Sequence, residues 1–181
     1  MTQKLVVWLG NPWEQYKNNR HNIGFTMLDE IVNSNNYWTF SYDNKYGGEV
    51  LMTNINWQKV YFLKPMEFMN KSWWPVSKLM NFFKIEAKDL LVIHDEIDLP
   101  VGTIKLKFWW GLAGHNGLRD IASKVWTQDF YRIRIGVDRP GDSSAQSVVD
   151  YVLWNFRKEQ IETIKDKYLD IERNFFEFLE K

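Results

Sequence analysis

Short apolar runs alternate along this chain with segments of helical periodicity, and this alternation constrains the fold more than any other feature. Leu90–Ile93 is a continuous apolar run, which is typical of a central strand covered on both faces. Lys4–Leu9 is a second candidate for a buried strand. Strands interleaved with helices predict an α/β fold.

The remaining segments complete this pattern. Glu49–Ile55 and Lys59–Leu63 form a predicted hairpin around Asn56-Trp57, which supplies an antiparallel part of the sheet. Two further segments alternate as strands do, Thr103–Phe108 and Tyr131–Val137. Helical spacing marks Ile23–Val32, Val76–Phe83, Gly117–Val125 and a long C-terminal helix from Ile161 to Phe178. We therefore predict a single domain over residues 1–181, with a mixed twisted sheet and helices on both faces.

Length and composition narrow the class of protein. The 181 residues suit one domain, and no internal repeat or linker divides them. The chain has no cysteine, which excludes disulfides, a thiolate nucleophile and a cysteine-based metal site. It has no apolar run of membrane-spanning length, and its first residues lack a signal-peptide cleavage pattern. The expected location is the cytoplasm.

Charge is balanced overall but unevenly distributed. Thr103–Arg139 contains seven Lys or Arg residues against three Asp, and Trp57–Lys88 contains six Lys against two Glu. This asymmetry permits a basic, phosphate-binding face on a neutral protein. The alternative is that these charges only solvate helix and strand surfaces.

Clusters of polar residues stand at or near the predicted ends of strands and helices, where α/β proteins bind ligands. They are Asn11-Pro12, Arg20-His21-Asn22, Phe68-Met69-Asn70, His94-Asp95-Glu96 and Gly114-His115-Asn116-Gly117. General base catalysis at neutral pH favours histidine, and a buried carboxylate fixes the histidine tautomer. His21 and Asp95 are therefore a candidate pair. Asparagine side chains can fix a substrate or stabilise an oxyanion.

Other residues in these clusters have simpler interpretations. His94, at the end of a strand, is expected to be structural. His115 is either a helix cap or a contact to RNA. The acids between His94 and Asp98 match no metal-binding spacing, so we predict no metal site.

Several motifs together make the chain resemble bacterial peptidyl-tRNA hydrolases, in order and over nearly its whole length. They are Leu9-Gly10-Asn11-Pro12, Tyr16 with Arg20-His21-Asn22, Phe68-Met69-Asn70-Lys71-Ser72, His94-Asp95-Glu96-Ile97-Asp98-Leu99-Pro100, Gly114-His115-Asn116-Gly117-Leu118 and Arg132-Ile133-Arg134-Ile135-Gly136. The resemblance implies hydrolysis of the ester bond of peptidyl-tRNA, which releases the peptide and recycles the tRNA. It implies that His21 activates the attacking water and that Asp95 stabilises the basic form of His21.

The resemblance also implies roles for other residues. Asn11 would help to distinguish a peptidyl group from a free aminoacyl group. Substrate-binding residues would be Tyr16, Phe68, Asn70 and Asn116, and tRNA-binding residues would be Lys107, His115 and Arg134. A monomer without cofactor is implied. An activated ester needs only a base, a water and oxyanion donors, so the lack of a cysteine or G-x-S-x-G nucleophile is no objection.

The ten tryptophans depart from the family pattern. The family has glycine at most of the matching positions, which are Trp8, Trp13, Trp73, Trp109, Trp110, Trp126 and Trp154. Turn chemistry also favours glycine at several sites. Asn56-Trp57 stands where a two-residue hairpin favours Asn-Gly, Pro12-Trp13 stands where a type II turn favours Pro-Gly, and Trp126 follows a predicted helix at its usual glycine position.

Two hypotheses account for these tryptophans. In the first, a UGA codon that means glycine in the source organism has been translated as tryptophan. In the second, the protein is tryptophan-rich and uses the indoles to stack on nucleic-acid bases. The first hypothesis predicts that most of these residues lie in turns, caps or tight approaches, several of them with positive φ.

Three functions of other classes compete with ester hydrolysis of peptidyl-tRNA. A non-catalytic RNA-binding relative would be favoured by loss of His21 or Asp95, and both are present. A dinucleotide-binding enzyme would need glycine at Trp8 and Trp13, and Pro12 with the polar stretch after it argues against a helix start there. A small-molecule esterase would make little use of the basic segments.

Overall fold

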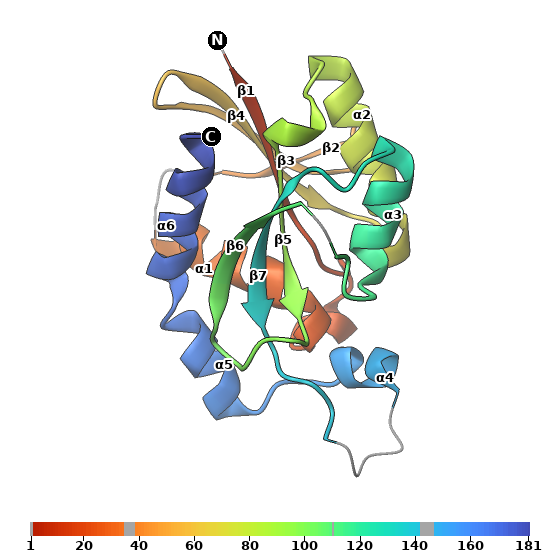
Figure 1. Ribbon diagram of the computed structural model, residues 1–181, viewed down its shortest axis with the longest axis vertical. Helices are drawn as coiled ribbons and strands as arrows, with labels where there is room; N and C mark the ends of the chain where they lie inside the picture. Colours follow the sequence, from red (N-terminus) through yellow and green to blue (C-terminus); the bar gives the residue numbers. More distant parts are fainter. Residues whose placement is uncertain (1, 35–38, 110, 142–146) are drawn as a thin grey trace.

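The structure is a computed structural model that describes residues 2–34, 39–109, 111–141 and 147–181, and the side chains of 32–34 are also left undescribed. Within these residues a seven-stranded sheet has the order β2-β3-β4-β1-β5-β7-β6 (Figure 1). The strands are β1 (Gln3–Trp8), β2 (Ser41–Asp43), β3 (Gly48–Ile55), β4 (Gln58–Pro65), β5 (Leu90–Glu96), β6 (Ile104–Phe108) and β7 (Tyr131–Gly136). Strands β4, β1, β5 and β7 are parallel neighbours, whereas β2, β3 and β6 pair antiparallel. The predicted mixed sheet is confirmed.

Helices cover both faces of this sheet, as predicted. They are α1 (Ile23–Ser34), α2 (Trp73–Phe83), α3 (Asn116–Val125), α4 (Val148–Leu153), α5 (Lys158–Lys165) and α6 (Tyr168–Leu179). Helices α1 and α6 pack on one face and α2 and α3 on the other (Figure 1). Four 3-10 turns connect them to the strands, namely η1 (Glu14–Tyr16), η2 (Arg20–Asn22), η3 (Met69–Lys71) and η4 (Ala87–Asp89).

Strand β5 lies at the centre of the sheet and is buried along its whole length. Leu91 and Ile93 pack into the cluster formed with α1 and α6, while Leu90 and Val92 pack into the cluster formed with α2 and α3. Alternate side chains of a strand point to opposite faces, so a strand covered on both sides must be apolar at every position. This explains the continuous apolar run of the sequence and fixes the end of β5 in a rigid setting.

The polar loops gather at one edge of the sheet because β1, β4 and β5 are parallel and end there. The start of α1 packs closely against this edge. A Cβ on Gly24 would lie 2.4 Å from the carbonyl oxygen of Leu9 and 3.1 Å from that of Ile93. Glycine at this position therefore lets the turn before α1, which carries His21, approach the end of β5.

Two expectations about the elements need correction. The predicted long C-terminal helix is two helices, because the end of α5 closes with an i to i+3 bond from Lys167 N–H to the Ile164 carbonyl and the chain turns before α6. The apolar stripe continues across the break, since Ile164 and Ile171 join the same core cluster. Strand β2 and helix α4 were not predicted, and both are too short to give a clear period.

Among the described residues no helix combines the length and apolar character needed to cross a bilayer.

The backbone at the tryptophans gives a mixed outcome. Trp57, Trp109 and Trp126 have φ of 64°, 64° and 61°, and Trp126 caps the end of α3 as expected. The prediction for Trp13 is wrong, because its φ of −87° and ψ of 143° are extended and it precedes the 3-10 turn η1. Trp154 is also extended, at the end of α4.

The other tryptophans lie in regular elements or outside the described residues. Trp8 is in strand β1, and Trp73 and Trp74 open helix α2. Trp38 and Trp110 lie outside the described residues, so the expectation for Trp110 is left open. Among the described residues, positive φ thus accompanies three of the predicted glycine-like positions, whereas Trp8, Trp13, Trp73 and Trp154 lack it.

Candidate active site

Asp95 is the centre of a buried polar cluster at the end of β5. Its Oδ1 accepts a hydrogen bond from His21 Nδ1 at 2.9 Å and another from His115 Nε2 at 2.8 Å. All three residues are at least nine-tenths buried. Because an ionised carboxylate only accepts, the ring nitrogen that faces Asp95 must carry the hydrogen in both histidines.

The tautomer of His115 is fixed from its other side. His115 is the N-cap of α3, and its Nδ1 accepts the backbone N–H of Leu118 at 3.3 Å. That nitrogen therefore has the lone pair and Nε2 has the hydrogen. The sequence left two roles open for His115, a helix cap or a contact to RNA. In the structure His115 caps α3 and also donates a hydrogen bond to Asp95.

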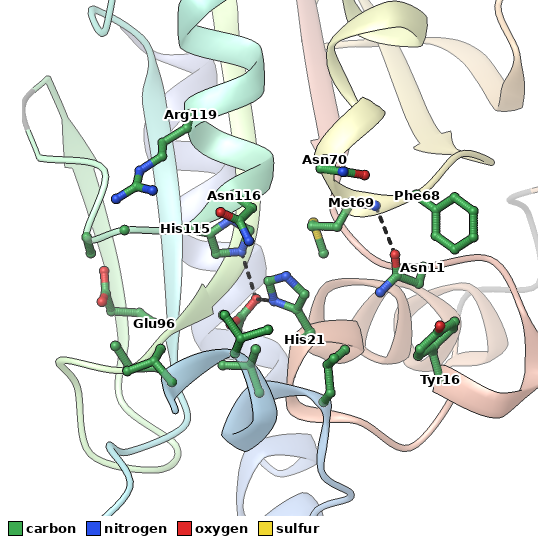
Figure 2. Close-up of a pocket in the computed structure, with 18 of the residues that line it drawn as sticks. Asn11, Tyr16, His21, Phe68, Met69, Asn70, Glu96, His115, Asn116 and Arg119 are labelled. Carbon is green, nitrogen blue, oxygen red and sulfur yellow. Dashed lines mark hydrogen bonds and ion pairs between the residues drawn. The ribbon is translucent and has the colours of Figure 1, made fainter. Parts of the chain in front are cut away.

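His21 comes from the 3-10 turn η2, immediately before α1. With Nδ1 donating to Asp95, its Nε2 has a lone pair and lies on the open side of the ring, toward Met69 and Asn70 (Figure 2). A neutral histidine held in this way can take a proton from a group in the pocket.

Charge and burial oppose each other at Asp95. Burial alone raises the pKa of Asp95, but the His21 and His115 rings beside it hold the pKa of that carboxyl well below its usual range. His94 lies next to it with its side chain fully buried, and Nδ1 donates to the backbone carbonyl of Asp95 at 2.6 Å. Burial, and then the neighbouring His115, hold the pKa of His94 well below its ordinary value. The predicted structural position of His94 agrees with this burial.

Asn11 follows β1 and is fixed on two sides, by a backbone N–H and by a side-chain amide. Its Oδ1 accepts the N–H of Met69 at 2.9 Å, and its main chain exchanges two hydrogen bonds of 2.8 Å with the Asn22 side chain. The Oδ1 contact orients the amide, so that the NH₂ group points toward the His21 side of the pocket (Figure 2). The site thus has a neutral donor close to its candidate base.

These residues line a pocket of about 550 Å³. The predicted substrate residues Tyr16, Phe68, Asn70 and Asn116 all border it (Figure 2). Trp13 stacks on Phe68, with ring centroids 3.9 Å apart, at the rim. The structure therefore brings all of the predicted catalytic and substrate-binding residues to one cavity.

An apolar wall opposite these residues was not predicted. Helix α4 lines the pocket with Val148, Val149, Val152 and Leu153. The signal for it was present, because Ser147 begins an S-x-x-D cap before an apolar stretch, and Ser147 Oγ accepts the N–H of Asp150 at 3.1 Å.

The basic residues of the central segment differ in their availability. Arg134 Nε donates to Glu96 Oε2 at 2.9 Å, and its side chain is 19% exposed. Arg132 is almost fully buried, with an NH1 donor on the Gly111 carbonyl. Lys107 is half-buried on the edge strand β6, and Lys105 is exposed there. The basic segment thus offers fewer exposed cations than its sequence suggests.

The three donor atoms of His21, Asp95 and His115 lie within 4.8 Å of one another, the spacing of a small metal site. In the hydrogen-bonded arrangement, however, both histidines direct an N–H at the carboxylate, whereas a metal needs their lone pairs. The geometry fits a hydrogen-bonded cluster better than a set of metal ligands.

Comparison with known proteins decides the family. The sequence profile described as peptidyl-tRNA hydrolase matches residues 5–181. The chain belongs to the peptidyl-tRNA hydrolase family. The family member from Neisseria meningitidis serogroup C is 46% identical over 156 residues, which are 84% of this chain and 78% of the relative. The one from Dichelobacter nodosus is 47% identical over 150 residues, 83% and 78% of the two chains.

The same family accounts for the fold. The crystal structure of peptidyl-tRNA hydrolase from Acinetobacter baumannii superposes with a TM-score of 0.83 at 34% identity, over 91% of this chain and 82% of that one. The resemblance seen in the sequence motifs is confirmed by this agreement.

Proposed function

We propose that this chain hydrolyses the ester bond of peptidyl-tRNA, with His21 as the general base. The observation that carries this proposal is the Nδ1–Oδ1 hydrogen bond of 2.9 Å between His21 and the buried Asp95, which leaves Nε2 of His21 on the pocket side. Membership of the peptidyl-tRNA hydrolase family supports the substrate.

In the proposed reaction a water bound between His21 and the ester carbonyl loses a proton to His21 Nε2 as its oxygen attacks the carbonyl carbon. Asp95 stabilises the imidazolium that results, as a buried carboxylate does in other His-dependent hydrolases. Asn11 donates its NH₂ to the developing oxyanion. The bond between the carbonyl carbon and the ribose oxygen then breaks as His21 returns the proton to that oxygen. Free tRNA and the peptide carboxylic acid leave, and the acid loses its proton to water.

His115 acts in this proposal as a positioning residue. It supplies a second N–H to the same Asp95 oxygen and is held in that tautomer by the N–H of Leu118. The two bonds keep the carboxylate ionised and fixed beneath His21. We therefore favour this role for His115 over the direct tRNA contact expected from the sequence.

The remaining residues are proposed to bind the substrate. Tyr16, Phe68, Asn70 and Asn116 border the pocket and would hold the peptidyl end. Lys107 and Arg134 would face the tRNA phosphates, with Arg134 held by Glu96. We propose a cytoplasmic enzyme that acts as a monomer without cofactor.

Two competing functions have observations against them. After β1 the chain enters the 3-10 turn η1 at Glu14, whereas a dinucleotide fingerprint leads into a helix N-terminus. A non-catalytic RNA-binding relative has no use for two histidines bonded to one buried carboxylate.

The test compares three substrates with the purified chain. Hydrolysis should be fast with an N-acylated aminoacyl-tRNA, slow with the same tRNA carrying a free amino acid, and negligible with a small aromatic ester. Equal rates on the small ester and the acylated tRNA would contradict the proposed substrate.

A further inference from the structure

Arg20, the residue before His21, is buried and makes its contacts away from the pocket. It is 6% exposed. Its NH1 donates to the carbonyl oxygens of Trp154 and Asn155, each at 3.1 Å, and its NH2 donates to Gln160 Oε1 at 3.2 Å. All of these acceptors lie just after α4 or at the start of α5.

Aromatic rings complete the environment of this guanidinium. Its central carbon lies 4.3 Å from the ring centroid of Tyr151 and 5.3 Å from that of Phe156. None of its partners in the described part of the chain is a carboxylate. A buried cation is therefore held by carbonyls, an amide and ring faces, a set that suits the planar fork of arginine and not the ammonium of lysine.

The main chain repeats the same connection. Arg20 N–H donates to the Trp154 carbonyl at 3.1 Å, Phe156 N–H donates to the Asn18 carbonyl at 3.1 Å, and Asn19 pairs with Asn155. Tyr151 of α4, whose ring faces Arg20, donates its hydroxyl to the Val137 carbonyl at 2.9 Å. The turn that carries the candidate base is thus joined to the segment that follows the apolar wall by the Arg20 side chain and by these main-chain bonds.

We propose that Arg20 is a positioning residue that sets the distance between His21 and the α4 wall, and so the fit of the peptidyl group. The proposal rests on the proposed function of the pocket. His21 has its own bond to Asp95, so loss of the guanidinium fork should loosen the wall more than the base. Substrate binding should then suffer more than the chemical step.

The test measures kcat, KM and melting temperature for Arg20→Lys with an N-acylated aminoacyl-tRNA. We expect KM to rise about tenfold, the equivalent of one lost charge-assisted hydrogen bond, with kcat changed by less than about threefold. Gln160 does not line the pocket, and its Oε1 accepts from both Arg20 and the N–H of Arg157; Gln160→Ala should shift KM in the same direction by less. Phe178→Leu, on the buried face of α6, is the control that lowers stability and leaves KM unchanged.

The expected tenfold rise in KM corresponds to about 1.4 kcal/mol. If Arg20→Lys folds and its KM stays within about twofold of the parent value, the proposed role of Arg20 is wrong. An equal rise in KM for Phe178→Leu would also overturn it, because general loosening would then explain both. Failure of the proposed function is separate, since it would appear as parent activity in His21→Ala.

A second inference rests on the left-handed tryptophans. Only a few per cent of non-glycine residues have positive φ, and the types enriched there are Asn, Asp and His. Of the eight tryptophans in the described residues, Trp57, Trp109 and Trp126 have it. Trp57 and Trp126 are 90% and 89% exposed, so packing gives no reason for indoles at these two turns.

Each of the three sites favours glycine for its own reason. Trp57 is the second residue of the two-residue turn between β3 and β4, where Asn56 also has positive φ. Trp126 is the left-handed cap of α3. Trp109 follows β6 and precedes a loop in which Gly111, Ala113 and Gly114 are also left-handed.

We infer that residues 57, 109 and 126 are glycine in the protein that the source organism makes, through a UGA codon read there as glycine. The test is mass spectrometry of tryptic peptides 46–59, 108–119 and 125–132 from the protein isolated from that organism. Each peptide should be lighter than its tryptophan form, with fragment ions that place glycine at the predicted site. Tryptophan at any of the three sites overturns the inference.

Discussion

The cluster around Asp95 and the turns at Trp57 and Trp126 differ in burial and in how well each side chain suits its position. In the cluster, Asp95 and His115 are buried, Asp95 Oδ1 accepts two hydrogen bonds, and both ring nitrogens of His115 have partners. At the turns, a large side chain extends into solvent from a backbone conformation that L-residues disfavour. Changes at the turns should therefore alter the free energy of unfolding and leave catalysis intact, whereas changes at Asp95 should act mainly on catalysis.

The largest effect is expected for Asp95→Asn. The amide no longer fixes the Nδ1–H tautomer of His21 or stabilises its imidazolium, so kcat should fall by about 10³–10⁴-fold, as for the equivalent change in other His-dependent hydrolases. Single-turnover hydrolysis of an N-acylated aminoacyl-tRNA measures this. Asp89→Asn is the matched control, because it breaks the ion pair of 2.9 Å with Lys4 at the other end of β5. A similar kcat for the two variants would break the comparison.

A second prediction concerns pH and His94. Its pKa is depressed in the folded protein, so below the unfolded value the unfolded chain binds one more proton. The free energy of unfolding should therefore be unaffected by titration of His94 above a pH of about 6.5. Below that pH it should fall as the pH falls, by at most about 1.4 kcal/mol per pH unit.

Urea unfolding between neutral and mildly acidic pH measures this slope. His94→Asn, which retains a donor for the Asp95 carbonyl, should flatten it. An unchanged slope in the variant would assign the pH dependence to another group.

The turns provide the third prediction. Trp57→Gly and Trp126→Gly should each raise the free energy of unfolding by roughly 1 kcal/mol, because relief of about 1–2 kcal/mol of left-handed strain exceeds the entropy that glycine adds to the unfolded chain. Trp74→Gly is the matched control inside helix α2, where Lys78 lies 3.6 Å from the indole ring, and it should destabilise the protein. Thermal unfolding of the three variants measures these changes in stability. If Trp57→Gly and Trp126→Gly both lower the stability, left-handed strain at the two turns is not the dominant effect.

The smallest effect is expected on the basic edge strand. Lys107→Ala should reduce the slope of log K for tRNA binding against log salt by about 1, because one fewer phosphate contact releases its counterion. The control is Lys181→Ala at the C-terminus. An unchanged slope would remove Lys107 from the tRNA-binding face.

Most of the sheet was predictable from the sequence because burial of its core strands imposes a simple apolar pattern. A strand covered on both faces must be apolar throughout, and Leu90–Ile93 meets this requirement. The break between α5 and α6 was missed, since the apolar stripe runs through Ile164 and Ile171 without interruption. Periodicity reports the buried face of a helix and not its ends.

The site was predictable in its residues but less so in their connections. His21 and Asp95 were predicted as a pair from their chemistry, and they meet because the start of α1 packs against the end of β5. The bond between His115 and Asp95 depends on the start of α3 facing the end of β5 across a loop, which no local pattern encodes. The burial of Arg132 likewise follows from sheet order, because β7 lies between β5 and β6.

The most direct test of the account is the rate of peptide release by His21→Ala, measured in a single turnover at saturating enzyme, with tRNA binding measured beside it. The rate should fall by at least about 10³-fold, since the variant lacks the base and the partner of Asp95, and the tRNA affinity should stay within about threefold of the parent. A rate within about tenfold of the parent would contradict His21 as the base, because general base catalysis alone contributes about 10²–10⁴-fold.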